Sequence, residues 1–109
     1  MKKYALTLNL KNDAILIEDY IRQHKEIWPE VEASIKEAGI IAMHIYRWGT
    51  KLFMIMEVDE TFSFEKKAAS DRQNKKVQEW EALMWKYQAP VEGANEGEKW
   101  VLMEEIFSL

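Results

Sequence analysis

Cysteine is absent from this chain, and glycine and proline are scarce, with four glycines and two prolines in 109 residues. Without cysteine there is no disulfide, no thiolate nucleophile and no zinc site of the cysteine type. The glycines do not cluster as they do in phosphate-binding loops or dinucleotide-binding turns, so those nucleotide motifs are excluded. The N-terminal segment also lacks the continuous apolar run of an export signal, and we expect a cytoplasmic protein.

Long apolar runs and an excess of positive charge are missing as well. No apolar segment approaches the roughly 20 residues that a membrane helix needs. The net charge of −4 disfavours binding to nucleic acid or to anionic lipid. We therefore expect no nucleic-acid partner and no membrane partner. The two histidines lie on different predicted elements without the close spacing of metal ligands, so we expect no metal and no other cofactor.

Apolar residues make up 48 % of the chain, and 109 residues are enough for one hydrophobic core but not for two. We therefore expect a single domain over residues 1–109. Alternation of apolar and polar residues is typical of half-buried strands. It predicts a strand over 2–10, and we expect further strands over 40–48, 52–58 and 99–107, the first two of these joined by a hairpin loop at Gly49-Thr50.

Apolar residues at helical spacing fill the intervals between these strands. Asp13 lies in a cap position for a helix that begins near residue 14, and Pro29 breaks this helix because it lacks a backbone N–H. A second helical piece then begins at Pro29 and ends before Gly39. A short helix is predicted over 61–69, and a longer one over 70–87 that begins with a capping box.

The resulting order of strand, helix, strand, strand, helix and strand is the split βαβ pattern of an α+β, ferredoxin-like sandwich. In that fold the helices cover one side of an antiparallel sheet. Two helices cannot cover both faces, and several strands are apolar on both, so we expect a homodimer packed sheet to sheet. Along 40–46 the two predicted faces are Ile40, Ala42, His44 and Tyr46, and Ile41, Met43 and Ile45.

His24 is the residue that most clearly indicates a site. Apolar positions from Ile17 and Ile21 to Trp28 follow helical spacing and predict a buried stripe, and His24 falls within it. Tyr20 lies one turn before His24 and Trp28 one turn after it. A titratable ring between two aromatic side chains is typical of a small-molecule pocket. A core histidine held by a single hydrogen bond is the alternative interpretation.

Five tryptophans in a short chain add to this indication. Indole rings pack against the C–H surface of sugars, whose hydroxyls form hydrogen bonds with Tyr, His and carboxylate groups. Exchange of a sugar's α and β anomers needs only one proton delivered and one removed, and a histidine that titrates near neutrality can do both. These residues favour a cofactor-free site for proton transfer on a sugar. The acidic loop 91–98 is either a connector or a cap over the pocket.

The pattern Y-x3-H-x3-W-P-E, from Tyr20 to Glu30, closely resembles the L-rhamnose mutarotase family, and the resemblance extends over nearly the whole chain. It implies a dimeric ferredoxin-like α/β barrel that interconverts the anomers of L-rhamnose without a cofactor. It also implies that His24 is the proton donor, that Tyr20 contacts the substrate and that Trp80 belongs to the sugar platform. We expect Trp28 to be a further substrate-binding residue.

Two positions depart from the family's pattern. Met43 stands where the rhamnose enzymes have a sugar-contacting tyrosine, and Trp80-Glu81 stands where they have paired tryptophans. We expect both Met43 and Glu81 to contact substrate, although Glu81 is alternatively a solvated residue on the outer face of its helix. The runs 49–57 and 80–88 also resemble the branch of the family associated with L-fucose.

The expected substrate is thus a 6-deoxy-L-hexose, with L-rhamnose slightly ahead of L-fucose. A cofactor-free monooxygenase or a ligand-binding module of the same fold is the alternative from another class, because folds of this kind serve many functions. A monooxygenase would take an apolar aromatic substrate, whereas a binding module would tolerate the loss of His24.

Overall fold

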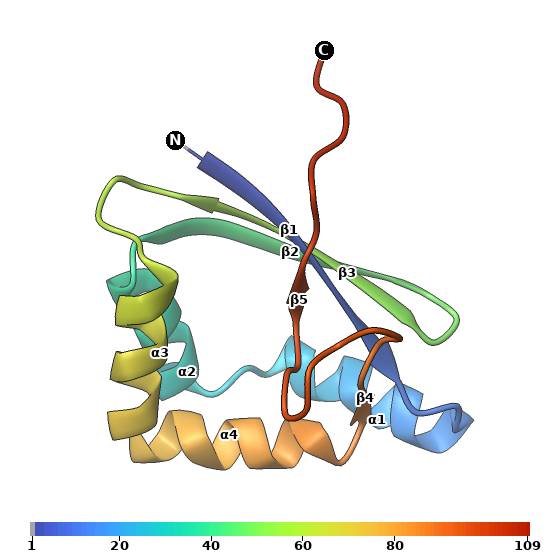
Figure 1. Cartoon of the computed structure of the whole chain (residues 1–109). Coiled ribbons are helices and arrows are strands. Elements are labelled where there is room, and N and C mark those ends of the chain that lie inside the picture. Colours follow the sequence, from blue (N-terminus) through green and yellow to red (C-terminus); the bar gives the residue numbers. More distant parts are fainter. Residues whose placement is uncertain (1) are drawn as a thin grey trace.

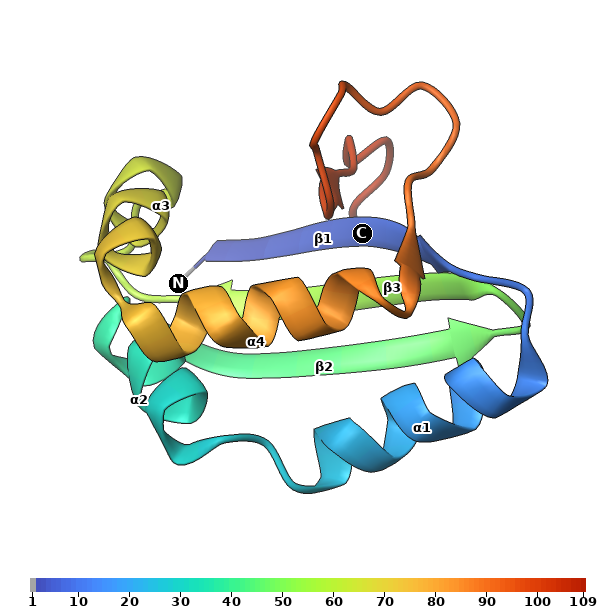
Figure 2. The same cartoon turned by 90° about the horizontal axis from the view of Figure 1, so that it is seen from below.

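Residues 2–109 are described by a computed structural model, in which they form an antiparallel sheet with four helices on one side (Figure 1). Seen from the helical side, α1 and α4 run along the sheet while α2 and α3 gather at one end (Figure 2). The strands are β1 (Lys2–Leu10), β2 (Ile40–Trp48), β3 (Lys51–Val58), β4 (Gln88–Ala89) and β5 (Val101–Leu102). The helices are α1 (Ala14–Lys25), α2 (Pro29–Glu37), α3 (Phe64–Gln73) and α4 (Lys75–Trp85).

The strand order β2-β3-β1-β4, with β5 also paired to β1, is the order of a ferredoxin-like sheet. It confirms the predicted α+β class. In the β1–β3 pair, Leu6 lies opposite Met54 and Leu8 opposite Leu52, so that the buried side chains of both strands share one face. This face packs against the helices and forms the core. Its buried members on β1 and β3 are Leu6, Leu8, Leu10, Leu52, Met54, Met56 and Val58.

The first two helices begin and end as the sequence predicts. The Asp13 carboxylate accepts hydrogen bonds from two main-chain N–H groups in the first turn of α1. Pro29 occupies the first turn of α2, where a backbone N–H would have no partner within the helix, so the lack of one in proline costs nothing. After α2 the chain turns through Gly39, whose φ of 94° is unfavourable for other residues and whose missing side chain leaves room for Asp59.

The next two helices do not divide where the sequence predicted. The predicted start of a helix at Ser70, with Ser70 as the first residue of a capping box, is wrong, because Ser70 lies inside α3. Ser63 caps α3 instead, and the Asn74 side chain caps α4 by accepting the N–H of Val77. Asparagine is as good a cap as serine, and a break at Asn74 lets the apolar face of α4 meet the sheet while the polar α3 turns aside.

The predicted last strand over 99–107 is reduced to β5, which has two residues. The N–H of Met103 still donates to the carbonyl of Ala5, and beyond it the chain leaves the sheet on the side opposite the helices (Figure 1). The segment 104–109 therefore continues without pairing to a strand of its own chain within residues 2–109. Ile106 is 88 % exposed, and Phe107 and Leu109 are exposed as well.

Two predicted faces are also corrected. On α1 the buried stripe passes through Tyr20 rather than Ile21, which is 37 % exposed. On β2 an irregularity in register between Ile40 and Ala42 inserts one extra residue into the strand. Such a bulge reverses the alternation of faces, so Ile40 lies on the helical side together with Met43 and not with Ala42.

The opposite face of the sheet is not covered by any helix of the described residues (Figure 1). Tyr46 on β2 is 58 % exposed, and Phe53 and Ile55 on β3 are half-buried. His44 and Tyr46 stack with ring centroids 6.5 Å apart, and Phe53 lies 6.4 Å from the Tyr46 ring. We call this surface the free face. As to membrane association, residues 2–109 contain no helix that is long and apolar enough to cross a bilayer.

Candidate active site

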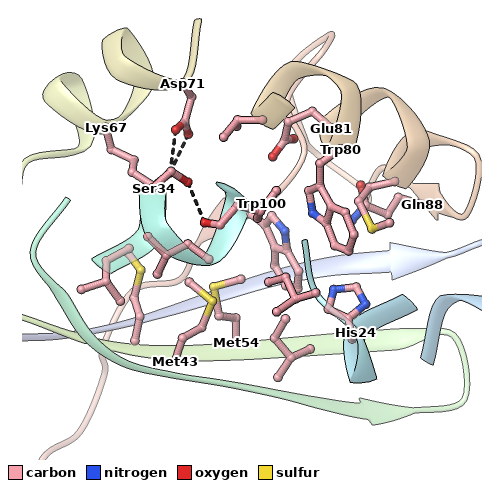
Figure 3. A pocket seen from close by; sticks show the side chains of 18 of the residues that line it. His24, Ser34, Met43, Met54, Lys67, Asp71, Trp80, Glu81, Gln88 and Trp100 are labelled. Atoms are coloured by element: carbon pink, nitrogen blue, oxygen red, sulfur yellow. Dashed lines mark hydrogen bonds and ion pairs between the residues drawn. The ribbon is translucent and has the colours of Figure 1, made fainter. Parts of the chain in front are cut away.

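A cavity of about 210 Å³ lies between the helical face of the sheet and the helices above it (Figure 3). This volume is below the range of about 300–1,000 Å³ that is usual for drug-sized ligands, so the cavity suits a small molecule. Methionines of the sheet, among them Met43 and Met54, form its floor. Polar groups reach it from two ends, one around His24 and one around Ser34.

His24 enters the cavity from the last turn of α1. Its Nδ1 lies 2.9 Å from the carbonyl oxygen of Tyr20, one turn earlier in the helix. A carbonyl only accepts hydrogen bonds, so Nδ1 carries a proton, and Nε2 of the neutral ring is an acceptor. Burial lowers the pKa of His24 from its usual 6.5, and the hydrogen bond to Tyr20 offsets part of that effect. At neutral pH the side chain is therefore a base.

Tyr20 is buried beside this ring, with the two ring centroids 4.4 Å apart. Its hydroxyl accepts a hydrogen bond of 3.3 Å from the Nε2 amide of Gln88, which leaves the phenolic proton free to be donated elsewhere. Burial raises the pKa of Tyr20 to about 12; the Gln88 bond opposes this rise and the charge of Glu81 adds to it. Tyr20 thus keeps its proton throughout the neutral range.

Gln88 is a buried polar residue of the cavity wall that the sequence reasoning missed. It is 4 % exposed, and among residues 2–109 no donor reaches its Oε1 atom. An unsatisfied buried acceptor costs about 1–3 kcal/mol. Such a cost is typical of functional sites, where a ligand supplies the partner. The only signal in the sequence is a glutamine between the buried Tyr87 and Pro90, and it is weak.

The upper wall is aromatic. Trp80 of α4 packs edge to face against His24, at 5.6 Å between ring centroids, and Trp28 packs in the same manner against Trp80 at 5.2 Å. Trp100 reaches the cavity from the segment just before β5 (Figure 3). Indole rings on two sides give a surface against which an apolar sugar face can pack.

A charged pair lies next to Trp80 at the rim of the cavity. Glu81 lines the cavity, and the Lys99 ammonium, from the end of the loop 91–98, lies 2.7 Å from its Oε2 atom. The same ammonium donates to the main-chain carbonyl of Glu81, also at 2.7 Å, and lies 4.8 Å from the centroid of Trp85. The cavity wall therefore depends on a residue 18 positions further along the chain.

The far end of the cavity has a second polar group of residues. Lys67 and Asp71 of α3 form an ion pair of 2.7 Å, and both side chains are largely buried. Ser34 of α2 lies close by and donates to the carbonyl of Val31 (Figure 3). The Lys67–Asp71 edge of α3 therefore faces the cavity.

The structure brings together five of the six residues predicted for the site. These five line the cavity and are Tyr20, His24, Met43, Trp80 and Glu81. Trp28 does not line it, and its contact is with Trp80. The second histidine, His44, is exposed on the free face. Within residues 2–109, no group of three or more His, Cys, Asp or Glu side chains is placed to hold a metal ion.

Known proteins match this chain over nearly its whole length. A family model described as L-rhamnose mutarotase matches residues 3–109. The chain belongs to the L-rhamnose mutarotase family. One relative, an L-fucose mutarotase of Xanthomonas campestris, is 43 % identical to this chain over 111 residues, which cover 100 % of this chain and 89 % of the relative. An L-rhamnose mutarotase of Shigella flexneri is 31 % identical over 113 residues, covering 100 % and 99 %.

Solved structures show the same fold in this family and outside it. The crystal structure of an L-rhamnose mutarotase from Formosa agariphila superposes with a TM-score of 0.73 at 19 % identity, covering 100 % of this chain and 99 % of that one. Tetracenomycin F2 cyclase from Streptomyces glaucescens, a polyketide cyclase, superposes with a TM-score of 0.64 at 17 % identity, covering 100 % and 97 %. The fold therefore serves more than one chemistry, and the site has to indicate the function.

Proposed function

We propose that this chain is an aldose mutarotase that interconverts the α and β anomers of a 6-deoxy-L-hexose. The observation that carries the proposal is the cavity in which His24, with Nε2 as its acceptor, lies beside a protonated Tyr20 and under Trp80. A base, an acid and an aromatic platform are what anomer exchange needs. Membership of the family supports the same reaction.

The proposed reaction begins with removal of the anomeric hydroxyl proton by Nε2 of neutral His24. As the C1–O1 double bond forms, the bond between C1 and the ring oxygen breaks, and the ring oxygen takes a proton from Tyr20. Rotation about the C1–C2 bond then presents the other face of the aldehyde. On closure Tyr20 recovers its proton, and His24 returns its own to O1. His24 thus acts as a base when the ring opens and as a proton donor when it closes, and the second step corresponds to the role that the family resemblance implies for it.

Burial assists both proton transfers. Trp80 and the Met43 floor exclude water around the ring, so hydrogen bonds to the developing charges are stronger there than in solvent. Gln88 donates to the Tyr20 oxygen and so stabilises the phenolate that forms when Tyr20 releases its proton. Each group acts through a hydrogen bond or a proton transfer.

Within this substrate class, L-rhamnose is favoured by the description of the family, and L-fucose by the higher identity to an L-fucose mutarotase, 43 % against 31 %. Met43 and Glu81 support the second sugar, because both replace aromatic residues of the rhamnose pattern. A carboxylate at position 81 selects for the orientation of a hydroxyl, whereas an indole ring selects for an apolar face.

Anomer-exchange NMR tests the proposal directly. The purified protein is added to L-rhamnose and L-fucose in separate samples, and the exchange rate between α and β signals is measured against the spontaneous rate. We expect strong acceleration for at least one of the two sugars. D-glucose, which carries a C6 hydroxyl and has the opposite configuration at C5, is the control and should exchange at or near the spontaneous rate. No acceleration with either 6-deoxy sugar would contradict the proposal.

We further propose that the protein acts as a homodimer in which the free faces of two copies meet. The support is the half-buried Phe53 and Ile55 and the exposed Tyr46 of the free face, since monomers rarely expose a continuous apolar surface. The tail 103–109, in which Ile106, Phe107 and Leu109 are exposed, leaves the sheet on this same side and would contact the second copy (Figure 1). A cytoplasmic location stays a prediction of the sequence.

A further inference from the structure

We propose that Lys99 is a positioning residue that sets the sugar preference of the cavity by fixing the carboxylate of Glu81. The proposal rests on the mutarotase function above and names a determinant of its specificity. Lys99 does not line the cavity, and neither the sequence patterns nor the family resemblance singled it out. Its effect is exerted through the side chain that it holds.

The geometry of the pair shows a fixed arrangement. The Lys99 side chain is 14 % exposed, although lysine normally extends into solvent. Its ammonium binds the main-chain carbonyl and the Oε2 atom of the same glutamate, each at 2.7 Å. Because one ammonium binds both the main chain and the carboxylate of Glu81, rotation about the side-chain bonds of Glu81 is restricted. The Glu81 side chain is 43 % exposed at the rim of the cavity, and no donor among residues 2–109 binds its Oε1, so this atom can accept from a ligand hydroxyl.

The lysine of this pair is more enclosed than the lysine of a surface ion pair, at 14 % against 72 % exposed for Lys36. The Lys99 ammonium lies 4.8 Å from the centroid of the Trp85 ring, in the position of a cation–π contact. The next residue, Trp100, is anchored in the cavity wall, so the backbone that carries Lys99 is held at the cavity as well. By contrast, the pair of Lys36 and Glu32 on α2 lies in solvent and is screened there.

A fixed acceptor discriminates between the two candidate sugars on chemical grounds. L-rhamnose and L-fucose have the same ring and the same methyl group, and they differ in the orientation of the hydroxyls at C2 and C4. An acceptor that moves freely can follow either orientation, whereas one held in place accepts from only one of them. Glu81 supplies the acceptor, and Lys99 supplies the restriction on its movement. Loss of Lys99 should then change the preference as loss of the Glu81 charge does.

The test is the ratio of kcat/KM for L-fucose to that for L-rhamnose, measured by anomer-exchange NMR for wild type, Lys99→Met, Glu81→Gln and the double variant. We expect Lys99→Met to change the ratio about tenfold, the size of one hydrogen bond to a charged group. The change should have the same direction as in Glu81→Gln. The double variant should show no more change than the larger single one, because both remove the same arrangement. Lys99→Arg, which keeps the cation, should restore most of the ratio.

Lys36→Met is the matched control, because it breaks a solvated Lys–Glu pair on another helix and should leave the ratio unchanged. If Lys99 only anchors the loop, Lys99→Met lowers stability and both rates together and leaves the ratio within about twofold of wild type, which overturns the proposal. A change opposite to that of Glu81→Gln, or effects that multiply in the double variant, overturns it too. Lys99→Gln replaces Lys99→Met if the latter does not fold. A wild type that accelerates neither sugar contradicts the mutarotase function itself, before any variant is compared.

Discussion

One histidine lies on each side of the sheet, and the surroundings of the two histidines differ in almost every respect. His24, in α1, lies on the side covered by helices, where its Nδ1 donates to the Tyr20 carbonyl and burial lowers its pKa. His44 belongs to the free face, where it is exposed and stacks on Tyr46. Both residues lie in stretches of the sequence that contain several apolar residues. The chemistry of a histidine in this fold is thus decided by what covers it.

The polar groups of the two faces differ in a related way. On the free side of β1, Thr7 is satisfied within the sheet, by donating to the carbonyl of Leu52 at 2.8 Å. On the helical side, Gln88 keeps one amide atom without a partner in a buried wall, and on the free side the Oδ1 atom of Asn9 is likewise buried without a partner within residues 2–109. Satisfied polar groups stabilise the sheet, whereas an unsatisfied one costs stability and is typical of a place where a ligand binds. Of Gln88 and Asn9, only Gln88 lines the cavity, so its unpaired atom is the one that a ligand in the cavity can reach.

The largest expected effect separates the two histidines. His24→Gln should lower anomer exchange by about 100-fold or more, because glutamine cannot transfer a proton, and one positioned acid–base group contributes at least that factor. His44→Gln, the matched control, should leave the rate near that of wild type. Rates are measured by NMR, and folding is checked by circular dichroism. Equal rates in the two variants would end the assignment of His24, and a His24→Gln chain that does not fold would favour the core-histidine interpretation.

The second effect concerns the free face. Ile55→Lys places a charge at the centre of the proposed dimer contact, and burying unpaired lysines costs several kcal/mol, so the dissociation constant should rise by about 100-fold or more. Light scattering at micromolar concentration should report a dimer for wild type and a monomer for the variant. Ile15→Lys, at an exposed site on α1, should stay dimeric. A wild type that is monomeric and fully active would show that the free face does not assemble.

A third effect is the pH dependence of kcat/KM. Because burial lowers the pKa of His24 below 6.5 and neutral His24 is the base, activity should fall as the pH falls through that lowered pKa, by about tenfold per pH unit below it. The high pKa of Tyr20 keeps the alkaline side flat through neutrality. Activity that instead rises on acidification would mean that the imidazolium form initiates the reaction.

The smallest effect compares the two polar groups. Gln88→Leu should lower anomer exchange about tenfold, since Tyr20 loses its hydrogen-bond donor, while the free energy of unfolding changes by less than ~1 kcal/mol. Thr7→Val should do the reverse, with a loss of ~1 kcal/mol in the free energy of unfolding and an unchanged exchange rate. Denaturant unfolding and NMR give the two quantities for each variant. A Gln88→Leu variant that is destabilised but fully active would place Gln88 among structural residues.

Local chemistry in the sequence determined much of this protein. Asp13, Pro29 and Gly39 fixed the first two helices, because caps, a missing N–H and a positive φ act over a few residues. The order of elements was enough for the ferredoxin-like class. The pattern around Tyr20 and His24 was enough for the family and for five of the residues that line the cavity. The helix boundaries depend on interactions between residues that are close in the sequence, so they can be read from it directly.

What only the tertiary structure decided depends on distant neighbours. A bulge in β2 set which side of the sheet Met43 faces, because one extra residue reverses the alternation. The strand predicted over 99–107 ended at Leu102, because the chain turns away from β1 after Met103 although β1 itself continues to Lys2. Lys99 reached Glu81, and Gln88 reached Tyr20 across 68 positions, only after the chain folded. Side-chain contacts at such separations leave no local signal, and they complete the site.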